Sequence, residues 1–277
     1  QWQNSAGTTL ASITPTTAND SVVMMISGTI VSNPLDASDA NAISIGSGAR
    51  AIEPGAISIG YNAGVRSDGT LNGHGIAIGT NSESCTYGAG TTSIAIGHRA
   101  KAGKGQCVVI GDQAEGYDAR DNATVIGATA VGWSNSVAIG HSAISKDAGV
   151  SVGYRAETYG GIVIGEDAGD GNGYCIIIGH GAQDNSCSEG VGIGQFSNIR
   201  GHAGITLGRY GEAYASGIAI GKYASAPASG FVVSIGDSVN ERGMFSGAFN
   251  STSSATDGYL NIFDNKLQVS GDGSVKV

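Results

Sequence analysis

Short segments of the form apolar–x–apolar–Gly recur along most of the chain and dominate its hydrophobic pattern. Fourteen copies occur, their glycines lie 12 to 19 residues apart, and ten copies have Ala three residues after the glycine. A repeat sustained over this length must be interpreted before any local motif. The copies are ISIG (43–46), ISIG (57–60), IAIG (76–79), IAIG (94–97), VVIG (108–111), TVIG (124–127), VAIG (137–140), VSVG (150–153), IVIG (162–165), IIIG (176–179), VGIG (191–194), ITLG (205–208), IAIG (218–221) and VSIG (233–236).

Each copy predicts one coil of a β-solenoid. Alternating Val and Ile bounded by Gly is typical of strands, and two short strands with two turns fit the length of one copy. We expect the branched residues to point into the coil, and the glycine to turn a corner at positive φ. We expect the small residue after it to fit inside the turn. Fourteen coils stacked at about 4.8 Å would make a rod of roughly 65 Å in which each coil contacts only its neighbours.

The residue between the two apolar positions should then point out of the coil, because side chains alternate across a strand. None of its fourteen occupants is charged, and soluble monomers rarely expose such a strip of small and apolar groups. We therefore predict that the strip is buried between parallel subunits around a common axis. The alternative is that solenoid faces are simply low in charge in this low-charge protein. The predicted interface residues are Ser44, Ser58, Ala77, Ala95, Val109, Val125, Ala138, Ser151, Val163, Ile177 and Ala219, and Gly192, Thr206 and Ser234 share the position.

Composition agrees with a solenoid and excludes some functions. The chain has 47 glycines, four prolines, 13% charged residues and a net charge of −9, which argues against binding nucleic acid. No segment reaches 18 apolar residues, so we expect no membrane insertion. The four cysteines form no CxxC motif, so we expect small buried thiols rather than zinc ligands, with a Cys175–Cys187 disulfide as the alternative.

Three segments carry a family resemblance. SVAIGHSA (136–143), SIAIGHRA (93–100) and GAISIGYNA (55–63) resemble the head repeats of trimeric autotransporter adhesins, the YadA-like head, over about residues 41–240. The resemblance implies a left-handed parallel β-roll and a side-by-side homotrimer. The four cysteines and the varied coil lengths depart from that family. The tail, YLNIFDNKLQVSGDGSVKV (259–277), alternates like β-strands and is similar to bacteriophage tail-fibre proteins, which also use such repeats.

Together these patterns predict an all-β chain in three parts. We expect an N-terminal β connector or cap at 1–40, a YadA-like head of about fourteen coils at 41–240, and a truncated C-terminal β module or connector at 241–277. The expected function is non-enzymatic and extracellular: a trimeric fibre or adhesin head that attaches a phage particle or bacterial cell to a host glycan or protein receptor. The alternatives are a polysaccharide-degrading tail spike, a purely structural spacer and an ice-binding solenoid. No recurring carboxylate pair and no Thr ladder supports the first or the last.

Two surface features are candidate receptor contacts. Long intervals before Gly79 and Gly97 carry extra polar segments at 65–75 and 83–92, which suit exposed turns. Aromatic residues also recur six positions after several motif glycines, at a corner where rings can stack on sugars. The alternatives are insertions without a role and packing of the rings against the next coil. The candidate residues are Arg66, Asp68, His74, Glu83 and Tyr87 in the long intervals, and Tyr117, Trp133 and Tyr159 at the corner, which Tyr214 shares.

No metal or cofactor site is predicted. His98, His141 and His180 each follow a motif glycine and could meet on a trimer axis, but the variety of the other occupants indicates a surface position. The segment EDAGDGNG (166–173) offers oxygen ligands for Ca²⁺, but its spacing does not match a calcium-binding loop. We interpret it as a polar turn.

Overall fold

The computed structural model describes residues 42–67, 74–86, 92–103, 106–116, 122–169, 173–185, 188–226 and 232–238. It also describes the backbone of short strands at 2–3, 9–11, 13–15, 22–24, 247–249, 259–262, 267–270 and 275–276. The chain divides into two compact units, 1–142 and 143–277. Within these described residues every named element is a strand.

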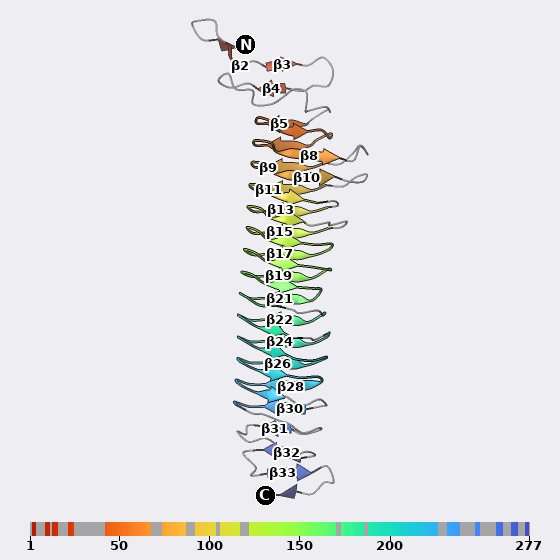
Figure 1. The fold of residues 1–277 in the computed structure, drawn as a ribbon, viewed down its shortest axis with the longest axis vertical. Coiled ribbons are helices and arrows are strands. Elements are labelled where there is room, and N and C mark those ends of the chain that lie inside the picture. The colour runs from red at the N-terminus through yellow and green to blue at the C-terminus, as the bar shows by residue number, and fades with distance from the viewer. Residues whose placement is uncertain are drawn as a thin grey trace. The chain divides into compact units, whose positions relative to one another are not determined.

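In the first unit, the motif segments form one parallel sheet and the short strands that follow them form a second (Figure 1). Equivalent residues pair in register, as Ile57, Ser58 and Ile59 do with Ile76, Ala77 and Ile78. The motif strands are β5 (Ile43–Ile45), β7 (Ile57–Ile59), β9 (Ile76–Ile78), β11 (Ile94–Ile96), β13 (Val108–Ile110), β15 (Thr124–Ile126) and β17 (Val137–Ile139). The second-sheet strands are β6 (Arg50–Ala51), β8 (Gly64–Ser67), β10 (Glu83–Thr86), β12 (Lys101–Ala102), β14 (Glu115–Gly116) and β16 (Val131–Gly132).

The second unit repeats this arrangement. Its motif strands are β19 (Val150–Val152), β21 (Ile162–Ile164), β22 (Ile176–Ile178), β24 (Val191–Ile193), β26 (Ile205–Leu207), β28 (Gly217–Ile220) and β30 (Val232–Ile235). Its second-sheet strands are β18 (Ile144–Ser145), β20 (Glu157–Thr158), β23 (Gln183–Asp184), β25 (Asn198–Ile199), β27 (Glu212–Ala213) and β29 (Ser225–Ala226). The prediction of an all-β parallel solenoid is confirmed. Within the described part of the chain, all fourteen motif segments form strands, and twelve of them are followed by a second-sheet strand, which gives about 12 turns where about fourteen coils were predicted.

The predicted orientation of the motif strands is wrong. The middle residue of each motif strand points into the coil: Ser44 is 7% exposed, and Ser58, Ala95 and Val125 are 0% exposed within one chain. The interior between the two sheets is narrow, so sizes are matched across it. Opposite Val125 stands Gly132, where an added Cβ would lie 2.5 Å from Val125 Cγ2. The absence of charge at these positions therefore reflects burial inside each coil. The predicted interface residues that this corrects are Ser44, Ser58, Ala77, Ala95, Val109, Val125, Ala138, Ser151, Val163, Ile177 and Ala219.

The branched residues on either side of that buried position face outward. Ile110, Ile126, Ile164 and Ile193 are 36–39% exposed, and the remaining flanking residues are intermediate or exposed. They form two columns on the motif sheet of each unit, which we call the flanking columns. The first comprises residues 43, 57, 76, 94, 108, 124, 137, 150, 162, 176, 191, 205, 218 and 233; the second comprises residues 45, 59, 78, 96, 110, 126, 139, 152, 164, 178, 193, 207, 220 and 235.

The motif glycines turn the corner as predicted. Their φ values lie between +126° and +148°, a region that L side chains rarely adopt. The carbonyl of the next glycine in the stack lies 2.0–2.5 Å from where an added Cβ would stand at most of these positions. Three residues further on, small side chains such as Ala63 and Ala100 are fully buried inside the turn, which confirms that expectation.

Strands also flank the solenoid coils in sequence. β1 (Trp2–Gln3) pairs antiparallel with β2 (Thr9–Ala11), and β3 (Ile13–Pro15) with β4 (Val22–Met24). After β30, β31 (Gly247–Phe249) and β32 (Tyr259–Ile262) continue in parallel, and β33 (Leu267–Ser270) and β34 (Val275–Lys276) follow antiparallel. Their roles as caps or connectors, and the boundaries near residues 40 and 240, stay predictions.

Candidate functional site

The predicted receptor residues fall into four groups. Asp68, Tyr87 and Tyr117 lie outside the described residues. The structure brings Arg66 and Glu83 together on neighbouring strands β8 and β10, with Arg66 Nε 3.2 Å from Glu83 Oε1. The Arg66 side chain is 67% exposed and that of Glu83 27% exposed, so this ion pair lies at the surface.

His74 lies away from that pair. Its Nδ1 is 2.6 Å from the carbonyl oxygen of Pro54, at a turn of an earlier coil. An added Cβ at Gly55 would stand 3.0 Å from the same nitrogen, so the imidazole covers that glycine. The contact indicates that His74 packs onto a turn, and it does not line the groove described next.

A groove with a volume of about 620 Å³ runs beside Arg66 and Glu83. Its floor is at Gly64, which pairs with Arg50 of β6 on one side and with Glu83 of β10 on the other. The positions of Arg50 and Gly64 face outward, because the next residue of each strand, Ala51 or Val65, is buried. A Cβ added at Gly64 would meet nothing within 4 Å. The missing side chain of Gly64 therefore opens the groove between the side chains of Arg50 and Glu83.

The corner side of the groove is lined by two asparagines. Asn62 and Asn81 have φ values of 52° and 55°, a left-handed conformation that Asn tolerates well. Asn62 Nδ2 donates to Asn81 Oδ1 at 3.4 Å, and the backbone N–H of Asn81 donates to the carbonyl of Tyr61 at 2.8 Å. These bonds hold both amides at the rim of the groove.

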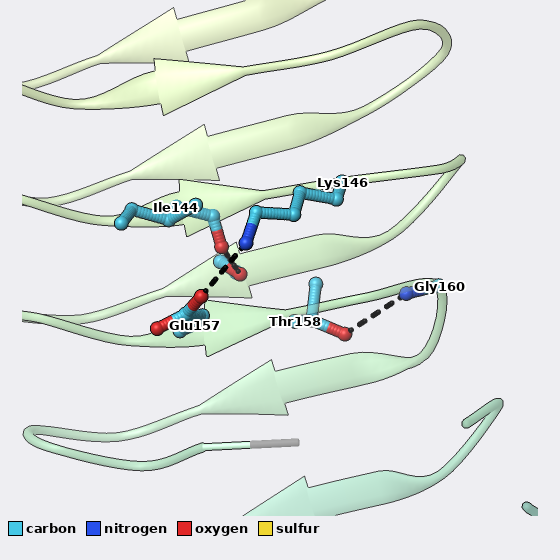
Figure 2. A network of polar contacts seen from close by, with 6 residues as sticks. Ile144, Lys146, Glu157, Thr158 and Gly160 are labelled. Atoms are coloured by element: carbon cyan, nitrogen blue, oxygen red, sulfur yellow. Dashed lines mark hydrogen bonds and ion pairs between the residues drawn. The ribbon is translucent and has the colours of Figure 1, made fainter. Parts of the chain in front are cut away.

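The predicted aromatic corner is only partly formed by the described residues. Trp133 is 36% exposed and Tyr159 is 39% exposed, and they belong to different units. Lys146 Nζ lies 3.7 Å from the centroid of the Tyr159 ring and donates to Glu157 Oε1 at 3.0 Å. Figure 2 shows this bond between neighbouring coils, together with the bond from the Gly160 N–H to the Thr158 hydroxyl. Lys146 thus occupies the face of the Tyr159 ring.

A second group of aromatic residues was missed. Phe196, Tyr210 and Tyr223 each lie two residues after a motif glycine, and their rings stack at centroid distances of 5.2 and 5.0 Å. The rings of Phe196, Tyr210 and Tyr223 therefore contact one another from coil to coil. The sequence signal that could have revealed this group is an aromatic residue two positions after the glycine in three consecutive copies of the motif.

Charged residues near the motif glycines also pair between coils. His98 Nδ1 lies 2.7 Å from Asp112 Oδ1, and hydrogen bonds from His98 and Gln113 lower the pKa of the Asp112 carboxyl. A separate exposed group brings one ligand atom each of Glu166, Asp167 and His180 within 4.8 Å of one another. Arg155 Nε already pairs with Asp167 Oδ1 at 3.4 Å, and ion pairing accounts for this arrangement.

Cys107 and Cys175 are both buried, as small packed thiols were expected to be. The alternative of a Cys175–Cys187 disulfide stays untested, because Cys187 lies outside the described residues. The side chains of Cys85 and Cys187 lie outside the described residues.

Comparison of the sequence with protein-family models gives no match, and comparison with curated proteins also gives none. Among the described residues there is no helix long and apolar enough to cross a membrane.

Proposed function

We propose that the chain is a non-enzymatic fibre or adhesin head, which associates side by side with copies of itself and attaches a phage particle or bacterial cell to a host surface. The supporting observation is the pair of flanking columns. Of their 28 positions only Thr124 is polar, the others being Ile, Val or Leu, and none is buried within one chain. Soluble monomers rarely expose apolar surface arranged in this way, and a second copy carries the complementary surface.

The opposite sheet is suited to remain in solvent. Its outward positions carry ion pairs between successive coils, such as Lys101 with Glu115 and Arg200 with Glu212. Burying the motif sheet of every copy around one axis would leave these charges exposed. The number three and the left-handed coil rest on the resemblance to YadA-like heads. A trimer of β-rolls is therefore the assembly that we propose, with its contacts at the flanking columns.

Attachment is the role that we assign to the exposed sheet. The groove at Gly64 lies on that sheet, beside two of the residues expected to contact a receptor, Arg66 and Glu83. Three copies would engage a surface at the same time, so each contact needs only weak affinity.

The test is retention of labelled protein on a panel of bacterial and animal cell surfaces, with a dissociated variant as the control. Ile110→Lys combined with Ile126→Lys places charge on one flanking column and should separate the copies. We expect saturable binding of the wild type and binding weaker by about tenfold or more for the variant, because multivalency is lost. The absence of saturable binding to any surface would contradict attachment and favour a spacer. Equal saturable retention of both proteins would contradict the role of assembly in attachment.

A further inference from the structure

The groove at Gly64 interrupts an otherwise continuous row of side chains. In the outward column of the second sheet, Arg50, Gly64, Glu83, Lys101 and Glu115 stand in successive register. Every position in this run except Gly64 carries a long charged side chain. Gly64 does not have the left-handed φ that would require glycine, and a Cβ there would meet open space. The gap is therefore not a requirement of the fold, and it is large enough for a small ligand.

The groove has the chemistry of an acidic-sugar site. Arg50 and Arg66 supply two guanidinium groups to the lining of the groove, where Arg66 also pairs with Glu83. A guanidinium presents paired N–H donors that match a carboxylate. The amides of Asn62 and Asn81 provide further donors and acceptors, which suit hydroxyl and ring oxygens of a saccharide.

We propose that this groove binds a saccharide unit bearing a carboxylate, such as a hexuronate of an acidic surface polysaccharide. The carboxylate lies between the guanidinium groups of Arg50 and Arg66, and the sugar ring occupies the space above Gly64. This inference rests on the proposed function, because it names the receptor chemistry of the same exposed sheet. The groove remains open in the proposed assembly, since the flanking columns lie on the other sheet.

Ligand-observed NMR and calorimetry on the intact assembled protein test the proposal, with trigalacturonic acid as the probe. Its methyl ester and inorganic phosphate are the comparison ligands. Gly64→Leu places a side chain in the groove, with a Cβ that meets nothing within 4 Å. Arg50→Lys keeps the charge but loses the paired donors. Gly169→Leu is the matched control, because Gly169 stands between Glu157 and Gln183 at the same position in another coil and also has nothing within 4 Å of its added Cβ.

We expect binding of trigalacturonic acid that Gly64→Leu abolishes, that Arg50→Lys weakens about tenfold and that Gly169→Leu leaves unchanged. The methyl ester should bind at least about tenfold more weakly than the acid. The proposal is overturned if the ester binds as tightly as the acid, if Gly64→Leu binds normally, or if phosphate displaces the sugar at equal concentration. If the wild-type protein assembles and attaches to cells but does not bind trigalacturonic acid, the ligand class alone is rejected. If the wild-type protein does not assemble, the proposed function is rejected.

Discussion

The Cβ that Gly97 lacks would lie 2.2 Å from the carbonyl oxygen of Gly111 in the next coil. Gly97 also has a φ of +137°, so an L side chain would be strained there even without the contact. The backbone N–H of Gly111 donates to the carbonyl of Ile96 at 2.8 Å, which holds the two coils at this separation. The glycine is required both by its own conformation and by the closeness of the stack.

Gly97→Ala should therefore lower the free energy of unfolding by about 3 kcal/mol or more. Gly64→Ala is the matched control, since Gly64 has no left-handed φ and its added Cβ has open space. It should be neutral or stabilising, because Ala restricts the unfolded chain more than Gly does. Thermal unfolding of both variants measures the difference. Equal losses would show that the corner does not depend on glycine at Gly97.

The ring stack makes a second prediction. Tyr210 lies between Phe196 and Tyr223, so Tyr210→Ala removes two stacked pairs and should cost about 1–2 kcal/mol of stability. The control is Tyr61→Ala, at an exposed corner position of the first unit, which should cost less than about 0.5 kcal/mol. Denaturant unfolding compares the two. A Tyr210→Ala variant as stable as the control would mean that the stack contributes nothing.

The pairing of His98 with Asp112 predicts an effect on titration. Hydrogen bonding from His98 lowers the folded-state pKa of Asp112 from its ordinary value of 3.8. The pair therefore favours the folded state above pH 3.8, and this contribution is lost as the pH falls through the folded-state pKa. NMR titration of the Asp112 carboxyl should show the lowered pKa, and His98→Ala should raise it. An unchanged midpoint in that variant would rule out His98 as the cause.

Lys146 predicts pH dependence in the opposite direction. Partial burial acts to lower its pKa, but hydrogen bonding to Tyr159 and Glu157 outweighs burial and leaves the pKa raised above 10.5. Its contribution is therefore full below pH 10.5 and lost as the pH rises through the folded-state pKa.

Lys146→Met should destabilise the protein by about 1 kcal/mol at neutral pH, and the difference from the wild type should shrink at pH values well above 10.5. Lys101→Met is the control, because Lys101 pairs with Glu115 at a more exposed position. It should cost about 0.5 kcal/mol or less. Thermal unfolding across this pH range is the measurement, and equal losses for both lysines at neutral pH would contradict a special role for Lys146.

The repeat predicted the coil, the glycine corner and the small residue after it, because each depends on backbone geometry that recurs with the period. The sidedness of the strand was predicted wrongly. Alternation allows either Ser58 or its neighbours Ile57 and Ile59 to face inward, and we placed the larger side chains inside. Because the space between the two short strands of a coil is narrow, Ser58 faces inward and Ile57 and Ile59 face outward. The matched pair of Val125 and Gly132 carries the size signal that could have revealed it.

The groove was only partly predictable from sequence. The long intervals drew attention to Arg66 and Glu83, but their contact depends on the register of β8 with β10. Gly64 is one of 47 glycines and does not belong to the motif. Its importance follows from its place between Arg50 and Glu83, which carry long charged side chains, and this neighbourhood is known only from the pairing of the second sheet.

Sedimentation equilibrium of the intact protein tests the central claim most directly, with Ile110→Lys/Ile126→Lys and Val131→Lys as a matched pair. Ile110 and Ile126 lie on a flanking column, while Val131 lies on the second sheet beside Glu115, where a lysine is compatible with its surroundings. We predict three times the chain mass for the wild type and for Val131→Lys, and a folded monomer or an aggregate for the double variant. A stable wild-type monomer at micromolar concentration, or a double variant that assembles like the wild type, would contradict association through the flanking columns.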